Sequence, residues 1–243
     1  MKYIFGFITA VSLILLAAFV SLRLESVQHT LAKKVSEELS VSYGIPTEIT
    51  AIEIYSINEI RLKGVLVKDL QGDTLLHANE AQAHLNTALL FDGLIRINTI
   101  GLGAPDIRLN RATADAPLNA QFIIDIINGN KKEDKNPKID LQINQVSIYD
   151  GKAAYDILDT ATDSTMFDKN HIAVKGLDCN ISLKKLNSEE LELDVRSIHA
   201  EEKCGFMLKE LSGRVEMKEK VLHLNGFDIK TGKSHISSES ISI

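Results

Sequence analysis

Apolar and polar residues alternate along most of this chain after Pro46, and this alternation is the feature that most limits its fold. Successive side chains of a β-strand point to opposite faces, so a period of two is typical of strands with one buried face. The segments with this spacing are Ile52 and Ile54, Val65 and Val67, Ile95 and Ile97, Ile107 and Leu109, Ile139 to Ile143, Leu191 to Val195, and Leu222 and Leu224. Residues typical of turns separate them. Residues 45–243 are therefore predicted to be a mainly β region of antiparallel strands.

A second pattern, apolar-x-x-apolar-x-apolar, recurs inside these strands. Its copies are Leu62/Val65/Val67, Ile97/Ile100/Leu102, Ile143/Val146/Ile148, Val174/Leu177/Cys179, Val195/Ile198/Ala200 and Leu224/Phe227/Ile229. A step of three interrupts the period of two, so each copy requires a bulge or a bend after which the side chains return to the same face. Strands that bend in this way favour an elongated, curved sheet that forms a groove. A closed β-sandwich with coincidental matches is the alternative.

Two segments have helical rather than strand periodicity. In residues 24–44 apolar residues recur every three or four positions, which indicates an amphipathic helix that Gly44 and Pro46 terminate. Its polar face is mixed rather than basic, so we expect this helix to cap the sheet rather than lie on a membrane surface. Within residues 119–128, the spacing of Phe122, Ile123, Ile126 and Ile127 predicts one short helix, and a charged loop over residues 131–138 follows it.

The first 23 residues are predicted to be a membrane anchor. Tyr3 to Leu22 contain no charged residue, and a helix of about twenty residues spans roughly the 30 Å of a bilayer core. A cleaved signal peptide is the alternative, but Val20 and Leu22 stand where cleavage requires small residues. Lys2 precedes the apolar run, which places the rest of the chain on the exported side.

The two cysteines, Cys179 and Cys204, both follow the apolar phase of predicted strands. We expect two buried free thiols, with a disulfide between them as the alternative in an exported chain.

No motif of catalysis or metal binding occurs. Gly101 and Gly103 lack the third glycine of a dinucleotide fingerprint, and the sequence contains no GxxxxGK[ST], GxSxG, HExxH or CxxC. His77 and His84 flank Glu80 in a segment that alternates like a strand, so we expect no metal, cofactor or catalytic site. The chain has 27 basic and 33 acidic residues and a net charge of −6, which argues against nucleic acid as a partner.

Three stretches resemble one family. They are LAKKVSEELSVSYGIPTEITAIEI; LKGVLVKDLQGDTLLHANEAQAHLN with IRINTIGLGAPDIRLNR and NAQFIIDII; and EEKCGFMLKELSGRVEMKEKVLHLNGFDIKTGKSHI. The first resembles the opening of AsmA-like and TamB-type envelope proteins, and the others look like TamB-like translocation and assembly proteins of Bacteroidota. The resemblance implies a single-pass inner-membrane protein with a periplasmic β-taco, linked to phospholipid transport and to outer-membrane protein assembly and secretion. Family members are longer, so we expect a chain truncated at its C-terminus, without the part that contacts an outer-membrane assembly protein.

The resemblance also assigns a role to the recurrent apolar positions. Under it, phospholipid acyl chains would contact one apolar surface formed by Val65, Val67, Ile100, Leu102, Val146, Ile148, Phe227 and Ile229. Residues such as Glu53, Lys68 and Lys218 alternate away from that surface. The competing hypothesis is a scaffold or interaction protein that does not transport lipid, with its apolar face covered by another layer.

Overall fold

The computed structural model describes residues 21, 24–56, 58–86, 95–127, 139–162, 166–186, 191–218 and 221–242. The predicted anchor, apart from Ser21, lies outside these residues, as does the loop at 131–138. None of the helices within the described ranges is both long enough and apolar enough to cross a membrane.

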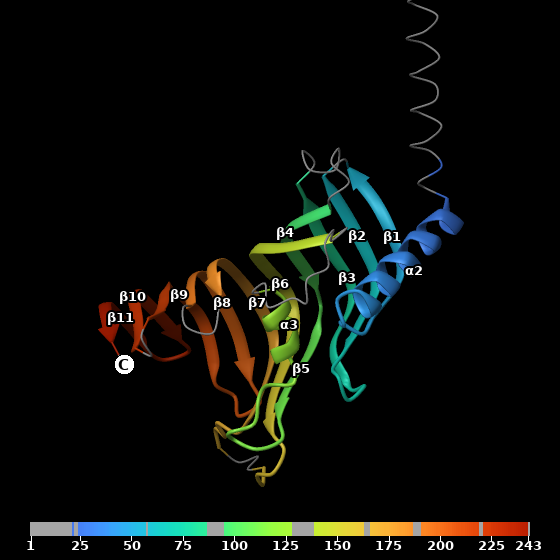
Figure 1. Ribbon diagram of the computed structural model, residues 1–243. Coiled ribbons are helices and arrows are strands. Elements are labelled where there is room, and N and C mark those ends of the chain that lie inside the picture. The colour runs from blue at the N-terminus through green and yellow to red at the C-terminus, as the bar shows by residue number, and fades with distance from the viewer. Residues whose placement is uncertain are drawn as a thin grey trace, which may run out of the picture.

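The described residues form one large curved sheet with two helices (Figure 1). The first half contains α2 (Glu25–Val41), β1 (Thr47–Ser56), β2 (Glu59–Lys68), β3 (Thr74–Leu85), β4 (Ile95–Gly103), β5 (Asp106–Arg111) and α3 (Gln121–Ile127). The second half contains β6 (Ile139–Ile157), β7 (His171–Leu186), β8 (Leu191–Glu202), β9 (Met207–Lys218), β10 (Val221–Thr231) and β11 (His235–Ser242). Both predicted helices and the mainly β character are confirmed.

The strand order is β1-β2-β3-β4-β6-β7-β8-β9-β10-β11, with β5 paired to β3 and β6. The prediction of an antiparallel sheet is right for most pairs and wrong for two, because β6 runs parallel to β4 and to β5. A hairpin turn can join only antiparallel neighbours, whereas parallel strands need a longer crossover. Here the crossover from β5 to β6 includes α3, which places this helix against the sheet.

Every copy of the recurrent pattern coincides with an irregularity in its strand. Gly64, Gly176 and Gly226 have φ angles of 57°, 55° and 58° inside three of the copies. Another copy spans the register shift between Val195 and Ile198. The remaining two copies lie on the paired strands β4 and β6. The register shifts between them, because the two residues from Ile97 to Thr99 on β4 lie opposite four residues on β6. The side chains therefore return to one face after each step of three, as predicted.

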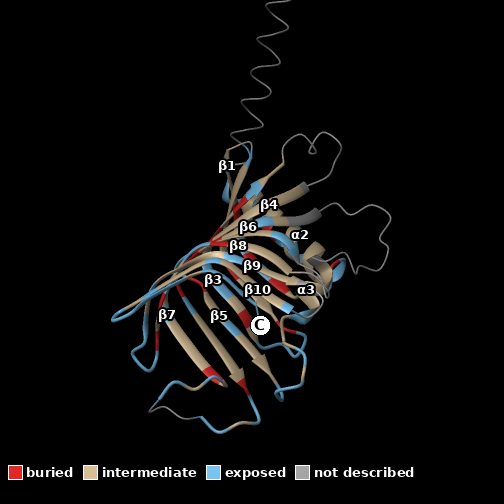
Figure 2. Ribbon diagram, turned by 90° about the vertical axis from the view of Figure 1, so that its left-hand side faces the viewer, coloured by how far each residue is buried: buried red, intermediate tan, exposed pale blue. Residues whose placement is uncertain are grey.

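These bends fold the sheet across its strands. Figure 2 looks along the sheet from the β11 end and shows the strands bent into a V, with α3 in its mouth. In Figure 1, α3 likewise lies inside the curve, in front of β6 and β7. The inner surface of the bend is thus the face on which α3 rests.

The helix α2 closes the β1 edge of the sheet. Leu31, Ala32 and Val35 of α2 pack with Ile49 and Ile52 of β1. Polar side chains of α2 also bond the exposed backbone edge of β1: Ser36 Oγ accepts from Ile49 N at 2.9 Å, Ser40 Oγ accepts from Thr47 N at 3.0 Å, and His29 Nδ1 lies 2.6 Å from Thr50 O. Since an uncovered edge invites pairing with another chain, α2 acts as the cap that its mixed polar face predicted.

Candidate functional site

One apolar row crosses the whole sheet, and we call it the apolar ladder. Residues paired across neighbouring strands project from the same face, so the row can be followed through the register of each pair. Its members are Ile52, Leu62, Ala81, Leu102, Ile148, Cys179, Ile198, Leu211, Ile229 and Ile236. Every strand except β5 contributes one member. The ladder is therefore continuous from one edge of the sheet to the other.

A second row widens the ladder in the middle of the sheet. Ile100 pairs with Val146, Val146 with Ile181, and Ile181 with Val195. Because these residues lie next to the ladder on β4, β6, β7 and β8, the two rows together form a strip two side chains wide.

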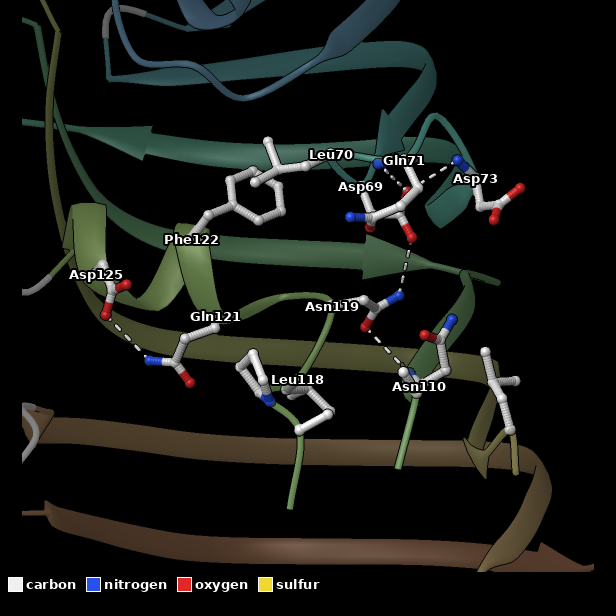
Figure 3. Close-up of a pocket in the computed structure, with 14 residues that line it drawn as sticks. Asp69, Leu70, Gln71, Asp73, Asn110, Leu118, Asn119, Gln121, Phe122 and Asp125 are labelled. Atoms are coloured by element: carbon white, nitrogen blue, oxygen red, sulfur yellow. Dashed lines mark hydrogen bonds between the residues drawn. The ribbon is translucent and has the colours of Figure 1, made fainter. Parts of the chain in front are cut away.

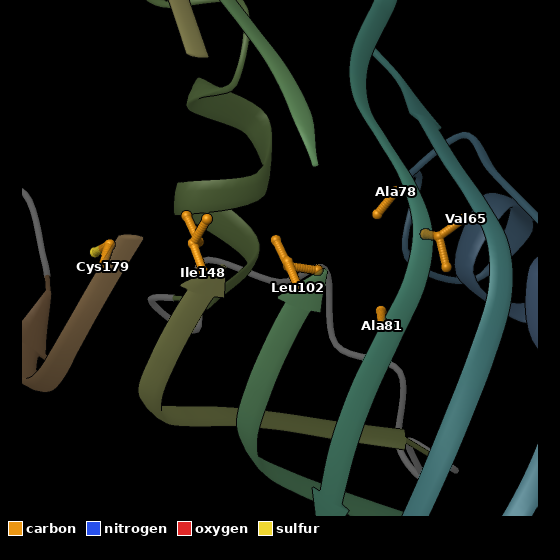
Figure 4. Packing of buried hydrophobic residues seen from close by; sticks show 6 residues of the cluster. All are labelled: Val65, Ala78, Ala81, Leu102, Ile148 and Cys179. Atoms are coloured by element: carbon orange, nitrogen blue, oxygen red, sulfur yellow. The ribbon is translucent and has the colours of Figure 1, made fainter. Parts of the chain in front are cut away.

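The ladder is more exposed from β8 to β11 than from β1 to β7, where every member except the half-buried Leu62 is buried. Ile52 is 4% exposed, Leu102 8% and Cys179 9%, whereas Ile236 at the far edge is 56% exposed. The members between them on β8, β9 and β10 are half-buried. Figure 4 shows the buried part, where the side chains of Leu102 and Ile148 point to the same side of the sheet. The described β8–β11 strands make their principal contacts with neighbouring strands, so this part of the ladder is the accessible one.

Two helices cover the opposite half. α2 packs over β1 and β2, as described above. Phe122, Ile123 and Ile126 of α3 pack against Tyr43 and Ile45, in a cluster that also contains Val67 of β2 and Ile97 of β4. The β1 end of the ladder, at Ile52 and Leu62, is thus covered by α2, whereas the cluster around α3 contains no ladder residue.

The structure brings together six of the eight residues predicted to share an apolar surface. Val65, Leu102 and Ile148 are buried in one cluster with Ala78, Ala81 and Cys179, and Val67, Ile100 and Val146 pack against it. The other two, Phe227 and Ile229, are half-buried on β10 outside this cluster. The ladder connects Ile229 to the cluster through the register, and Phe227 lies two residues away on the same strand.

Sequence reasoning missed ladder residues that the repeat does not contain, among them Ala81, Leu211 and Ile236. The alternation of Ala81 with Ala83 and of Leu211 with Gly213 is a signal that could have identified two of them. No signal identifies Ile236, because only its pairing with Ile229 places it in the row.

The outer face of the sheet is polar and linked by ion pairs. Asp194 of β8 lies between Lys184 Nζ at 2.9 Å and Arg214 Nε at 2.7 Å, and the hydrogen bond from Arg214 lowers the pKa of its carboxyl. Glu53, predicted to face away from the groove, lies 3.9 Å from Lys63 Nζ on this face. Such exposed pairs contribute little stability, about 0–1 kcal/mol each. Their main consequence is a clear separation of a charged face from an apolar one.

A cavity of about 480 Å³ lies beside α3, between the β2–β3 turn and the end of β5 (Figure 3). Asp69 and Asn119 are its central polar residues. Asp69 accepts hydrogen bonds from Gln71 N at 3.0 Å, Asp73 N at 2.9 Å and Asn119 Nδ2 at 3.3 Å. These bonds build the turn between β2 and β3. Both central side chains already form hydrogen bonds with other groups of the protein. The polar residues of this cavity are therefore explained by the turn and the loop that they stabilise.

Two other buried titratable residues also have structural roles. His171 Nδ1 lies 2.8 Å from Asp156 Oδ1, and this hydrogen bond raises the pKa of the imidazole. Burial raises the pKa of Glu202, but hydrogen bonds from the side chain and N–H of Cys204 and from the N–H of Ala173 outweigh it and hold the pKa below its ordinary value. His171 thus stabilises the connection between β6 and β7, and Glu202 stabilises the turn between β8 and β9. No cluster of three metal-ligating side chains occurs among the described residues.

Both cysteines are free, and they differ in environment. Cys179 is buried in the ladder, as expected. The expectation that Cys204 is buried on a strand is wrong, because this residue is exposed in the turn between β8 and β9. The apolar phase of β8 ends at the turn, where the chain reverses and exposes its side chains.

No protein-family model matches this chain, and no curated protein matches its sequence. The candidate site therefore rests on the geometry of the apolar ladder.

Proposed function

We propose that the sheet binds the hydrocarbon chain of a phospholipid along the apolar ladder. In this proposal the protein is a β-groove protein, anchored in the bacterial inner membrane, that supports phospholipid transport to the outer membrane and protein translocation and assembly there. The observation that supports it best is the unbroken row of apolar side chains from β1 to β11, with exposure that increases toward β11.

A continuous apolar strip suits an acyl chain for a simple physical reason. Covering a chain contributes about 0.8 kcal/mol for each buried CH₂ group and requires no specific polar contact. The strip must also be long enough. At about 4.8 Å between strands, the accessible part from β8 to β11 extends roughly 14 Å. This length is close to the roughly 15 Å that one leaflet contributes to a bilayer core. One acyl chain therefore fits along the accessible part.

The proposed cellular setting comes from the sequence. An anchor over residues 3–22 would hold the sheet beside the inner membrane, and the resemblance to TamB-like proteins supports an envelope location. A partner in outer-membrane assembly belongs to the same proposal.

A scaffold that carries no lipid is the second candidate, and one observation favours it. Between β1 and β7 every ladder residue except the half-buried Leu62 is buried, and α2 covers the β1 end of the row. If the β8–β11 part is covered in the same way by another protein layer, the apolar face is simply a core.

Photocrosslinking in intact cells distinguishes the two. A benzophenone side chain introduced at Leu211 or Ile229, on the ladder, should capture phospholipid. The matched controls are Glu210 and Lys230, the adjacent residues on the same strands, which form an ion pair on the outer face at 2.7 Å. Equal labelling of ladder and control positions, or none on the ladder, would contradict the proposal and leave the scaffold.

A further inference from the structure

The helix α3 lies where the proposed hydrocarbon path would continue toward β1. It rests inside the bend of the sheet and contacts β6, the strand that contributes Ile148 to the ladder. A chain that moves along the ladder from β11 would reach α3 after passing β7.

The contacts that hold α3 in this place are apolar. Phe122, Ile123 and Ile126 pack against Tyr43 and Ile45. The described hydrogen bond between side chains of the helix, from Gln121 Nε2 to Asp125 Oδ1 at 3.0 Å, is internal to it. Hydrocarbon can make the same kind of contact with the same surface, so the helix and an acyl chain are chemically equivalent occupants.

The helix is also only partly buried. Residues 122–126 are all half-buried, and none reaches full burial. By contrast, Asn119, two residues before the helix, is firmly held. Asn119 Oδ1 accepts from Asn110 N at 3.1 Å, and Asn119 Nδ2 donates to Arg108 O at 3.2 Å and to Asp69 Oδ2 at 3.3 Å. Asn119 is thus held by hydrogen bonds, whereas α3, which follows it, is held by apolar contacts. This is the geometry of a lid with its hinge at Asn119.

We propose that α3 is an autoinhibitory lid that occupies the inner end of the hydrocarbon path and swings out when an acyl chain enters. This inference rests on the proposed function. It makes α3 an internal competitor, so the apparent Kd for hydrocarbon equals the intrinsic Kd divided by the fraction of molecules in which α3 is displaced.

Binding of a pyrene-labelled fatty acid to the purified full chain tests the lid. The double substitution Phe122→Ser and Ile126→Ser removes two of its apolar contacts, whereas Ile124→Ser is the matched control, because Ile124 lies on the same helix outside the cluster. We expect the double variant to bind the probe about tenfold more tightly than the wild type, and the control to bind as the wild type does. In the wild-type chain, the probe should also accelerate amide hydrogen exchange in residues 121–127.

The outcomes separate the lid from the groove. If no protein binds the probe, the proposed function fails, and the lid fails with it. If the wild type binds, but the double variant binds equally or more weakly and exchange in α3 is unchanged, then α3 is a fixed wall and only the lid is overturned. The exchange measurement uses the wild-type chain, so it decides the question even where the double variant does not fold.

Discussion

The exposure gradient of the ladder predicts that one substitution has very different effects at its two ends. Ile148 on β6 is 8% exposed and is paired with Leu102 and Cys179. Ile229 on β10 is half-buried and has the strongly exposed Ile236 as its outer neighbour. An aspartate introduced at each position therefore tests whether the ladder is closed at β6 and accessible at β10.

The expected magnitudes follow from burial. Replacing Ile148 forfeits about 1.5–3 kcal/mol of hydrophobic burial, and leaving an unpaired carboxylate in the cluster adds several kcal/mol. Ile148→Asp should thus lower the free energy of unfolding by about 5 kcal/mol, comparable with the entire 5–15 kcal/mol of a typical domain. At Ile229 the carboxylate can reach water, so Ile229→Asp should cost about 1 kcal/mol.

Urea unfolding of the purified chain, followed by circular dichroism at neutral pH, measures both values. Ile148→Asn separates the effect of charge from the effect of shape, because asparagine has nearly the same size as aspartate and carries no charge. Burial raises the pKa of a carboxyl group, so the penalty of Ile148→Asp should shrink as the pH falls, while that of Ile148→Asn stays constant. Equal losses at Ile148 and Ile229 would refute the gradient, and a small loss at both would mean that the whole ladder is open to water.

Three further predictions concern the frame of the sheet. Gly213→Ala should lower the free energy of unfolding by about 1–3 kcal/mol, because φ is 144° there and a Cβ would lie 2.9 Å from an aromatic ring of β10; Gly232→Ala, in open space, should be neutral in the same urea assay. The lowered pKa of Glu202 stabilises the fold fully above pH 4.5, its ordinary pKa, and this stabilisation is lost as the pH falls further. Glu202→Gln should therefore make the free energy of unfolding depend less on pH below 4.5. An unchanged pH dependence in that range would contradict this role of Glu202. Maleimide should label Cys204 rapidly in the folded chain and Cys179 only after unfolding, because burial raises the pKa of the Cys179 thiol; two equally fast thiols would contradict the structure.

Local features of the chain were predictable because short-range sterics decide them. The period of two specifies strands, and the spacing of Phe122, Ile123 and Ile126 specifies a short helix wherever it docks. The step of three in the recurrent pattern required bulges or bends, since side chains on a regular strand alternate strictly. For the same reason Val65, Leu102 and Ile148 could be assigned to one face without knowledge of their partners.

Pairing between distant segments decided the rest. The parallel arrangement of β4 and β6 depends on how the crossover through α3 returns to the sheet, and nothing within either strand encodes its neighbour's direction. Ile236 joins the ladder only through its register with Ile229. The exposure gradient likewise depends on which strands have a helix above them. By itself, the sequence determined that one face of each strand is apolar. Only the tertiary structure decided that these faces align into one row, buried at the end that α2 covers and accessible at the other, because alignment and burial are properties of neighbouring strands and layers rather than of any single strand.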